Sequence, residues 1–369
     1  MASESRKTGE EKLSRLLRIT GVGDFLLSDR HLQLMHGFDD SRNTYGNHYM
    51  ATAYFSRGAG PVMKNEGLDS IPQLRPGIPF ILDGARYLPG DPGLVKQAIL
   101  DYGPVYTMLY FKRKDVDTTS FIMRNPENPR NHINHAAVLV GWNDTLTTME
   151  GKGAWILQNS LGPSFGDRGF FYVPYENEDI LKHNAVWNAW KPFGDNNRIL
   201  YYDTLGSFES YGFNDSVCYG LTRYTAAEDC RIVRLATHVN NPGTYVAFEV
   251  FSDFDVENKA LSGRLTATGD TYCMFPGYYT VDLQQGIDIP AGSDFYVMAR
   301  YVAPYSTQPL PVEHAIEDYS DPHIMEGTNW VNPDAEKWPR AWYECGPGSP
   351  YPALDFDLCI RAIIEIIKN

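Results

Sequence analysis

The hydrophobic period of the chain changes once, and this change limits the folds that it can adopt. The first 60 residues favour short helices, which we expect at about 9 to 19, 28 to 36 and 46 to 56. From Val105 onward, apolar segments with the period of strands follow one another between turn-rich loops. Because the helices precede the strands instead of alternating with them, the pattern predicts an α+β domain with an antiparallel sheet.

A second domain is expected beyond residue 198. The chain has 369 residues, more than the roughly 250 to 300 at which a single hydrophobic core stops growing. A polar, asparagine-rich connector covers residues 190–198, and from Ile199 short strands recur between Gly, Pro and Asn turns. The sequence therefore predicts an α+β domain over residues 1–189, a linker over 190–198 and an all-β sandwich over 199–369.

Charge and composition exclude several classes of partner. With 32 basic and 46 acidic residues the net charge is −14, which opposes binding to nucleic acid or to anionic lipid. No run of about 18 apolar residues suggests a membrane span, and the polar N-terminus lacks the apolar stretch of a signal peptide. Phosphate-binding glycine loops are absent, so no nucleotide cofactor is expected.

Two patterns resemble metal sites only loosely. His132 and His135 have a spacing found in metal sites, but no third ligand is placed near them in the sequence, which favours an ordinary loop histidine. Asp253, Asp255 and Glu257 lack the glycine that a calcium loop requires, so a solvated acidic turn is the better interpretation. We therefore expect no metal site.

One pair of residues points to catalysis. His135 begins an apolar strand segment, and Asn159 ends the next one, ahead of a glycine-rich turn. A side-chain hydrogen bond from an asparagine can hold an imidazole in the tautomer and orientation that proton transfer needs. The simpler alternative is a histidine at a strand start that bonds only the backbone, and the order of strand, histidine, asparagine and glycine turn favours catalysis.

These residues resemble the papain-like cysteine peptidases. The similar segments are residues 134–142, 159–170, 101–105 and 27–31, and residues 47–62 look like the prokaryotic branch that carries a C-terminal lectin-like domain. Segments 201–206, 277–281, 311–313 and 357–362 resemble that lectin-like domain. The resemblance implies an N-terminally incomplete papain-like fold followed by a β-sandwich.

The same resemblance implies a function and a location. In a cysteine endopeptidase of this type, His135 would be the catalytic base and Asn159 would orient it. The expected partners are a peptide or protein substrate and, for the second domain, a glycan or cell-surface ligand. The family also implies an extracellular or cell-surface protein.

The nucleophile of the family is missing from this sequence. It should precede the histidine by about 130 to 150 residues, yet the chain has five cysteines and all follow His135: Cys218, Cys230, Cys273, Cys345 and Cys359. Leu161 and Phe165 also stand where the family usually has tryptophan. We therefore expect an N-terminally truncated peptidase that is inactive as given. The alternative is a non-catalytic relative that binds peptides or glycans at a surface.

Overall fold

The computed structural model describes residues 27–39, 46–63, 80–125, 132–265, 269–333 and 342–368. The α-helices in these ranges are α2 (Asp29–Met35), α3 (His48–Ser56) and α4 (Pro92–Tyr102), and short 3₁₀ turns span Arg113–Asp115 and Pro352–Leu354. The helices expected at about 28 to 36 and 46 to 56 are confirmed. The helix expected at about 9 to 19 lies outside the described residues.

Side-chain caps explain where these helices begin. Ser28, Asn47 and Asp91 each accept a hydrogen bond from the backbone N–H three residues later, at 2.8–3.1 Å. Helix α4 also has Pro92 in its first turn, and it ends at Gly103, whose φ of +80° suits glycine. The start and stop of each helix are therefore encoded locally.

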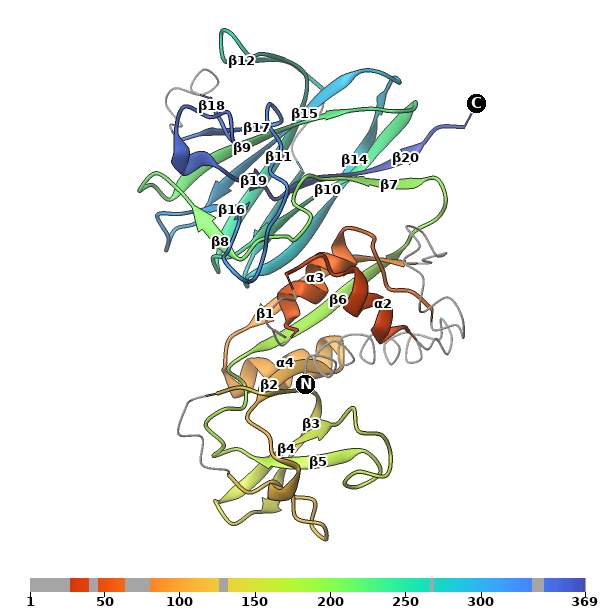
Figure 1. Cartoon of the computed structure of the whole chain (residues 1–369), viewed down its shortest axis with the longest axis vertical. Coiled ribbons are helices and arrows are strands. Elements are labelled where there is room, and N and C mark those ends of the chain that lie inside the picture. Colours follow the sequence, from red (N-terminus) through yellow and green to blue (C-terminus); the bar gives the residue numbers. More distant parts are fainter. Residues whose placement is uncertain are drawn as a thin grey trace.

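The largest sheet in the described part of the chain has ten antiparallel strands and takes strands from both expected domains (Figure 1). The N-terminal strands follow the order β5-β4-β3-β2-β6-β1, and β14-β10-β20-β7 continue the sheet. Their bounds are β1 (Phe80–Leu88), β2 (Val105–Leu109), β3 (His135–Thr147), β4 (Lys152–Gln158), β5 (Phe170–Pro174), β6 (Asn184–Pro192), β7 (Asn197–Leu200), β10 (Cys230–Val239), β14 (Gly277–Ile289) and β20 (Ile360–Ile366).

A second sheet packs against the C-terminal half of the first and closes a β-sandwich. It comprises β9 (Val217–Thr225), β11 (Thr244–Asp255), β12 (Ala260–Arg264), β13 (Gly269–Cys273), β15 (Asp294–Val302), β17 (Asn329–Asn332) and β18 (Tyr343–Glu344). A small sheet adds β8 (Glu209–Tyr211), β16 (Leu310–Glu313) and β19 (Asp357–Leu358). Ile232 and Leu235 of β10 meet Phe248 and Val250 of β11 in a shared, fully buried core. The predicted all-β sandwich is confirmed.

The sequence suggested that this sandwich is a separate unit, but the structure joins it to the N-terminal domain through a shared sheet. Strand β1 pairs with β14, with Ala85 opposite Tyr278, so one sheet continues from domain to domain. The expected connector at 190–198 is largely strand, because β6 runs to Pro192 and β7 begins at Asn197. Pairing between strands nearly 200 residues apart leaves no local pattern, which is why the sequence concealed it. The bounds given for the two domains stay a prediction.

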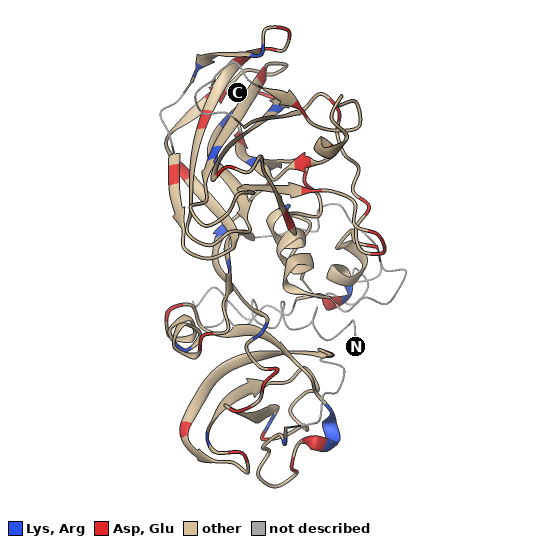
Figure 2. Ribbon diagram, turned by 90° about the vertical axis from the view of Figure 1, so that its left-hand side faces the viewer, with Lys and Arg blue, Asp and Glu red and all other residues tan. Residues whose placement is uncertain are grey.

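Two helices position the N-terminal half of the sheet. Val95 and Ala98 of α4 pack with Leu139 and Leu157 on one face. Tyr54 and Phe55 of α3 pack with Trp187 and other aromatic residues on the opposite face. None of the described helices is long and apolar enough to cross a membrane. Acidic and basic positions are interspersed along both domains, as Figure 2 shows.

Candidate active site

His135 is the first residue of β3 and lies opposite Leu109 of β2. Its side chain is buried, and its ring stacks on Phe111 with the centroids 4.4 Å apart. Asn134 holds Phe111 in place: its Oδ1 accepts the Phe111 N–H at 2.7 Å, and its Nδ2 donates to the Phe111 carbonyl at 3.0 Å. The residue before the histidine thus fixes the aromatic ring that supports it.

Asn159 directly follows β4 and is also buried. Its backbone N–H donates to the Gly169 carbonyl at 2.8 Å, and its Oδ1 accepts the Leu161 N–H at 3.3 Å. Its Nδ2 has no hydrogen-bond partner among the described residues. The turn therefore holds the carboxamide oxygen and leaves the donor nitrogen available for another acceptor.

The strand register brings His135 and Asn159 to one face of the sheet. Val138 pairs with Gln158, so Asn159 follows opposite Ala137, two residues from His135. Residues two apart along a strand share a face, and diagonal neighbours on adjacent strands are about 7–8 Å apart, within reach of long side chains. A direct bond between the two side chains, expected at about 2.6 to 3.2 Å, stays a prediction.

The turn after Asn159 depends on glycine. Gly162, Gly166 and Gly169 all have positive φ, and a Cβ on Gly166 would lie 2.0 Å from the Phe170 carbonyl oxygen. Within this turn, Phe165 is buried against Phe111, so another aromatic ring replaces the tryptophan expected there. Leu161, in contrast, is 38% exposed and provides little cover.

The cysteines of the chain lie in its C-terminal half. All five are buried, and all lie in the strands and loops after β8. Burial raises the pKa of Cys218 and of Cys273 to about 12 and raises the pKa of Cys345 and Cys359 well above its usual value. Since the thiolate is the reactive form, burial lowers the nucleophilicity of these four thiols at neutral pH.

The residues that loosely resemble metal sites in the sequence make other contacts in the structure. The His132 ring contacts the Tyr110 ring at 6.3 Å. Asp255 accepts hydrogen bonds from the backbone N–H and Nδ2 of Asn258, which lower the pKa of its carboxyl group. Among the described residues, no three His, Cys, Asp or Glu side chains gather closely enough to hold a metal ion.

Sequence comparison adds a family assignment to this geometry. Residues 84–187 match the family described as papain family cysteine protease, and residues 199–363 match the lectin like domain. The chain therefore carries a papain-family cysteine protease domain followed by a lectin-like domain. The protease domain holds both His135 and Asn159.

Solved structures show the same two-domain architecture. The clostridial cysteine protease Cwp84 after propeptide cleavage has a TM-score of 0.80 and 18% sequence identity, and the match covers 99% of this chain and 94% of that one. The protease and lectin-like domains of Cwp84 from Clostridium difficile, described as a surface layer associated protein, have a TM-score of 0.79 and 17% identity, over 99% and 85% of the two chains. At this identity the likeness shows the fold.

Mouse cathepsin S is 28% identical over 95 residues. The match covers 24% of this chain and 25% of cathepsin S, so the chain spans only about a quarter of that relative.

Sequence reasoning proposed the histidine and asparagine as a catalytic pair, which stays a prediction, and it did not foresee the contacts around them. The Asn134 clamp on Phe111 involves a residue 23 positions away, and only strand pairing brings the two together. The asparagine immediately before the histidine was the one available signal.

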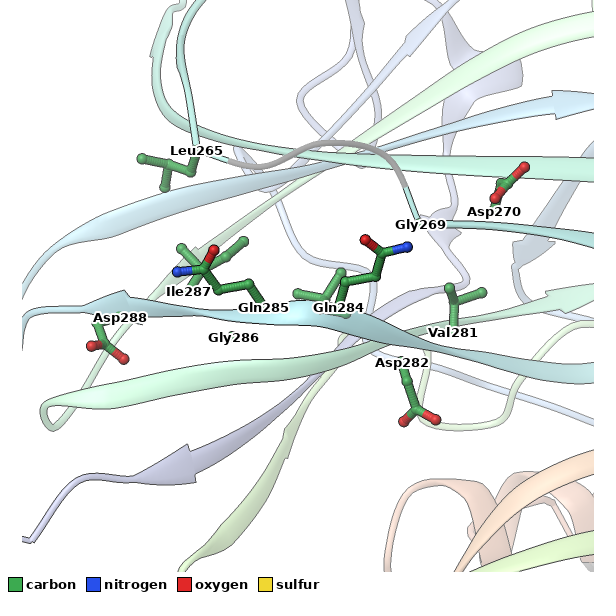
Figure 3. A pocket seen from close by; sticks show the side chains of 11 residues that line it. Leu265, Gly269, Asp270, Val281, Asp282, Gln284, Gln285, Gly286, Ile287 and Asp288 are labelled. Atoms are coloured by element: carbon green, nitrogen blue, oxygen red, sulfur yellow. The ribbon is translucent and has the colours of Figure 1, made fainter.

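The lectin-like domain has a hollow of its own along β14 (Figure 3). It measures about 630 Å³, and its walls carry the side chains of Gln284, Gln285 and Asp270. Amide and carboxylate groups of this kind can donate and accept hydrogen bonds with hydroxyl-rich ligands.

Proposed function

We propose that this chain forms most of a papain-type cysteine endopeptidase, with His135 as general base and Asn159 as the group that orients it. The register that places both side chains on one sheet face carries this proposal. The Phe111 ring stacked on His135 supports it further, because a packed imidazole keeps one orientation for proton transfer.

The reaction would proceed through a covalent thioester. His135 takes the proton of a nucleophilic thiol, and the resulting thiolate attacks the carbonyl carbon of the peptide bond. The imidazolium then gives its proton to the leaving amine, and water hydrolyses the thioester with His135 again acting as base. The Asn159 Oδ1, which accepts the Leu161 N–H at 3.3 Å, would also accept the N–H of one ring nitrogen, while the other, unprotonated nitrogen takes the thiol proton.

The 369-residue chain should not cleave peptides by itself, because its five thiols are buried and lie outside the protease domain. We infer that a segment outside these 369 residues supplies the thiol, because the sequence has no cysteine before Cys218. The surface-layer association of Cwp84 supports a cell-surface location, and the hollow along β14 suits a glycan or another surface ligand.

Supplying the missing thiol tests this proposal. We would join a segment bearing the glutamine and the Cys-Trp of the family to the N-terminus and measure cleavage of dye-labelled casein with a reducing agent. His135→Ala should lower the cleavage rate by about 10²- to 10⁴-fold, and Asn159→Ala should lower it less. Met149→Ala, at a site 87% exposed in the β3–β4 loop, serves as the matched control.

Two outcomes would contradict the proposed endopeptidase function. One is cleavage by the original chain that survives His135→Ala. The other is a thiol-bearing chain that folds but cleaves nothing. The second result would favour the alternative function, a non-catalytic protein that binds peptides or glycans.

A further inference from the structure

Two exposed tyrosines lie close together on the lectin-like domain. Tyr272 belongs to β13 and is 62% exposed, and Tyr305, in the turn after β15, is 88% exposed. A Cβ placed on Gly243, in the loop between β10 and β11, would lie 3.6 Å from the Tyr272 hydroxyl oxygen and 3.5 Å from Cε2 of Tyr305. Both rings therefore border the same glycine, although they come from different segments of the chain.

Hydrogen bonds join the loop that carries Gly243 to both tyrosine-bearing segments. The Gly243 N–H donates to the Cys273 carbonyl at the end of β13, at 2.9 Å. Asn241 Nδ2 donates to the Gln308 carbonyl in the loop between β15 and β16, at 2.8 Å. The backbone therefore fixes the position of the two tyrosines relative to one another.

Tyr305 lies in a closed turn. The Ser306 N–H donates to the Ala303 carbonyl at 3.0 Å, and the Ala303 N–H donates to the Ser216 carbonyl at 2.8 Å. Ala303 is fully buried, so the base of the turn is anchored while the Tyr305 side chain stays exposed. Binding a ligand here would cost little ordering of the loop, because its backbone is already held by hydrogen bonds.

Hydroxyl and carboxylate groups lie beside these rings. Tyr245 of β11 is directly opposite Tyr272, so the two side chains share a face of the sheet. Asp270, two residues before Tyr272 on the same face, is exposed and accepts a hydrogen bond from the Tyr245 hydroxyl. Asp270 also borders the hollow along β14 (Figure 3). Such a surface suits a ligand that has both apolar faces and hydroxyl groups.

A neutral glycan chain fits this combination of groups. The C–H face of a hexose ring packs on an aromatic ring, while its hydroxyls exchange hydrogen bonds with phenol and carboxylate groups. Nucleic-acid bases also stack on aromatic rings, but the Asp270 carboxylate and the net charge of −14 oppose a polyanion. An apolar peptide would remove the polar groups from water without replacing their hydrogen bonds.

We propose that Tyr272 and Tyr305 form a stacking platform, beside Gly243, that binds a neutral glycan chain. This inference rests on the glycan binding proposed above and deepens it, because it names a second surface close to the hollow along β14. It does not depend on His135 or on peptide cleavage.

Calorimetric titration of the 369-residue chain with hexasaccharides tests this inference. The neutral probes are the β-1,4-linked hexamers of glucose, N-acetylglucosamine and mannose, and hexagalacturonate is the anionic probe. At least one neutral hexamer should bind, with a Kd at least about tenfold below that of hexagalacturonate. Tyr305→Ala and Tyr272→Ala should each raise this Kd by about tenfold, because each variant loses one stacked ring.

Two further variants separate stacking from other effects. Tyr305→Phe keeps the ring and should retain most of the affinity. Tyr351→Ala is the matched control, because Tyr351 is 49% exposed and packs on Tyr343 of β18, at the opposite edge of the second sheet. Its Kd should equal that of the original chain.

Failure of every neutral hexamer to bind, or an unchanged Kd in both tyrosine-to-alanine variants, would overturn the inference. If Gln284→Ala weakens binding and the tyrosine variants do not, the platform fails and the hollow along β14 remains the proposed glycan site. If the tyrosine variants weaken binding but the thiol-bearing chain cleaves nothing, the endopeptidase proposal fails and the platform stands.

Discussion

The junction between the two domains and the candidate active site both bury polar side chains, but they pair them differently. At the junction, Arg361 of β20 is fully buried and bonds both carboxylate oxygens of Asp203 at 2.7–2.9 Å. Two further N–H groups bond the Asp203 carbonyl and the Ser56 hydroxyl of α3, each at 2.8 Å. The guanidinium group thereby links the last strand of the lectin-like domain to a helix of the protease domain.

At the active site, in contrast, a backbone N–H orients the Asn159 side chain, and one side-chain donor has no hydrogen-bond partner among the described residues. The amide oxygen of Asn159 is held by its own turn, and its Nδ2 bonds nothing among the described residues. An ion pair with several hydrogen bonds stabilises the fold. A site that transfers a proton needs side chains that are oriented but can still form a further hydrogen bond. The following predictions test this difference, beginning with the largest effect.

Removing the junction arginine should have the largest effect on stability. Arg361→Met leaves Asp203 buried without its counter-charge, which typically costs about 3–5 kcal/mol. We would measure the free energy of unfolding by urea titration. The matched control is Arg231→Met, whose pair with Asp288 at 2.6 Å is exposed, so its unfolding midpoint should stay unchanged. Similar losses in the two variants would show that the junction pair has no special role.

The strand pairing at the junction should be sensitive to one methyl group. Gly277 has a φ of +150°, and a Cβ there would lie 2.0 Å from the Ala85 carbonyl oxygen of β1. Gly277→Ala should therefore lower stability by roughly 1–3 kcal/mol more than a glycine replacement without a clash. Gly292→Ala is that control, because its φ is also positive and no atom lies within 4 Å. Thermal unfolding of both variants measures the difference, and equal losses would refute a tight β1–β14 contact.

The junction should also weaken as the pH rises. Burial, together with the charge of Asp203, raises the pKa of Glu313 to about 9, although its carboxylate accepts the N–H groups of Thr204 and Leu205. Since the folded state holds this proton more tightly than the unfolded state, stability should fall between about pH 5 and pH 9, by at most about 1.4 kcal/mol per pH unit. Asp357, with a pKa raised by burial to about 7, acts in the same direction at lower pH. Urea titrations at several pH values in this range give the free energy of unfolding, which should fall less steeply with pH in Glu313→Gln than in the original chain. An equally steep fall in the two proteins would assign the pH dependence to other groups.

The smallest effect concerns the cover over the active site. Leu161 is 38% exposed, and the larger indole ring of a tryptophan at this position would shield the Asn159 amide from water. In the thiol-bearing chain, Leu161→Trp should raise the cleavage rate by at most about fivefold, equivalent to about 1 kcal/mol. Leu100→Trp on the exposed side of α4 is the control and should leave the rate unchanged. A lower rate in Leu161→Trp would show that the leucine fits this site better than the ring.

Short-range signals explain what could be predicted from the sequence. Caps at Ser28, Asn47 and Asp91 place the helices, and continuous apolar runs place the buried parts of β3 and β4. The order of histidine, strand, asparagine and glycine turn was enough to single out His135 and Asn159. The Phe111 clamp and the tyrosine platform beside Gly243 could not be predicted, because their members come from separate segments.

By itself, the sequence determined the helices, most strands, the candidate catalytic pair and the confinement of the thiols to the second domain. All of these depend on residue type and on spacing within about a dozen positions. Only the tertiary structure decided that one sheet joins the domains, that Arg361 links β20 to α3, and that Tyr272 and Tyr305 of the lectin-like domain border one glycine. These features depend on strand register and buried charge pairing between distant segments, and such contacts exist only once the chain has folded.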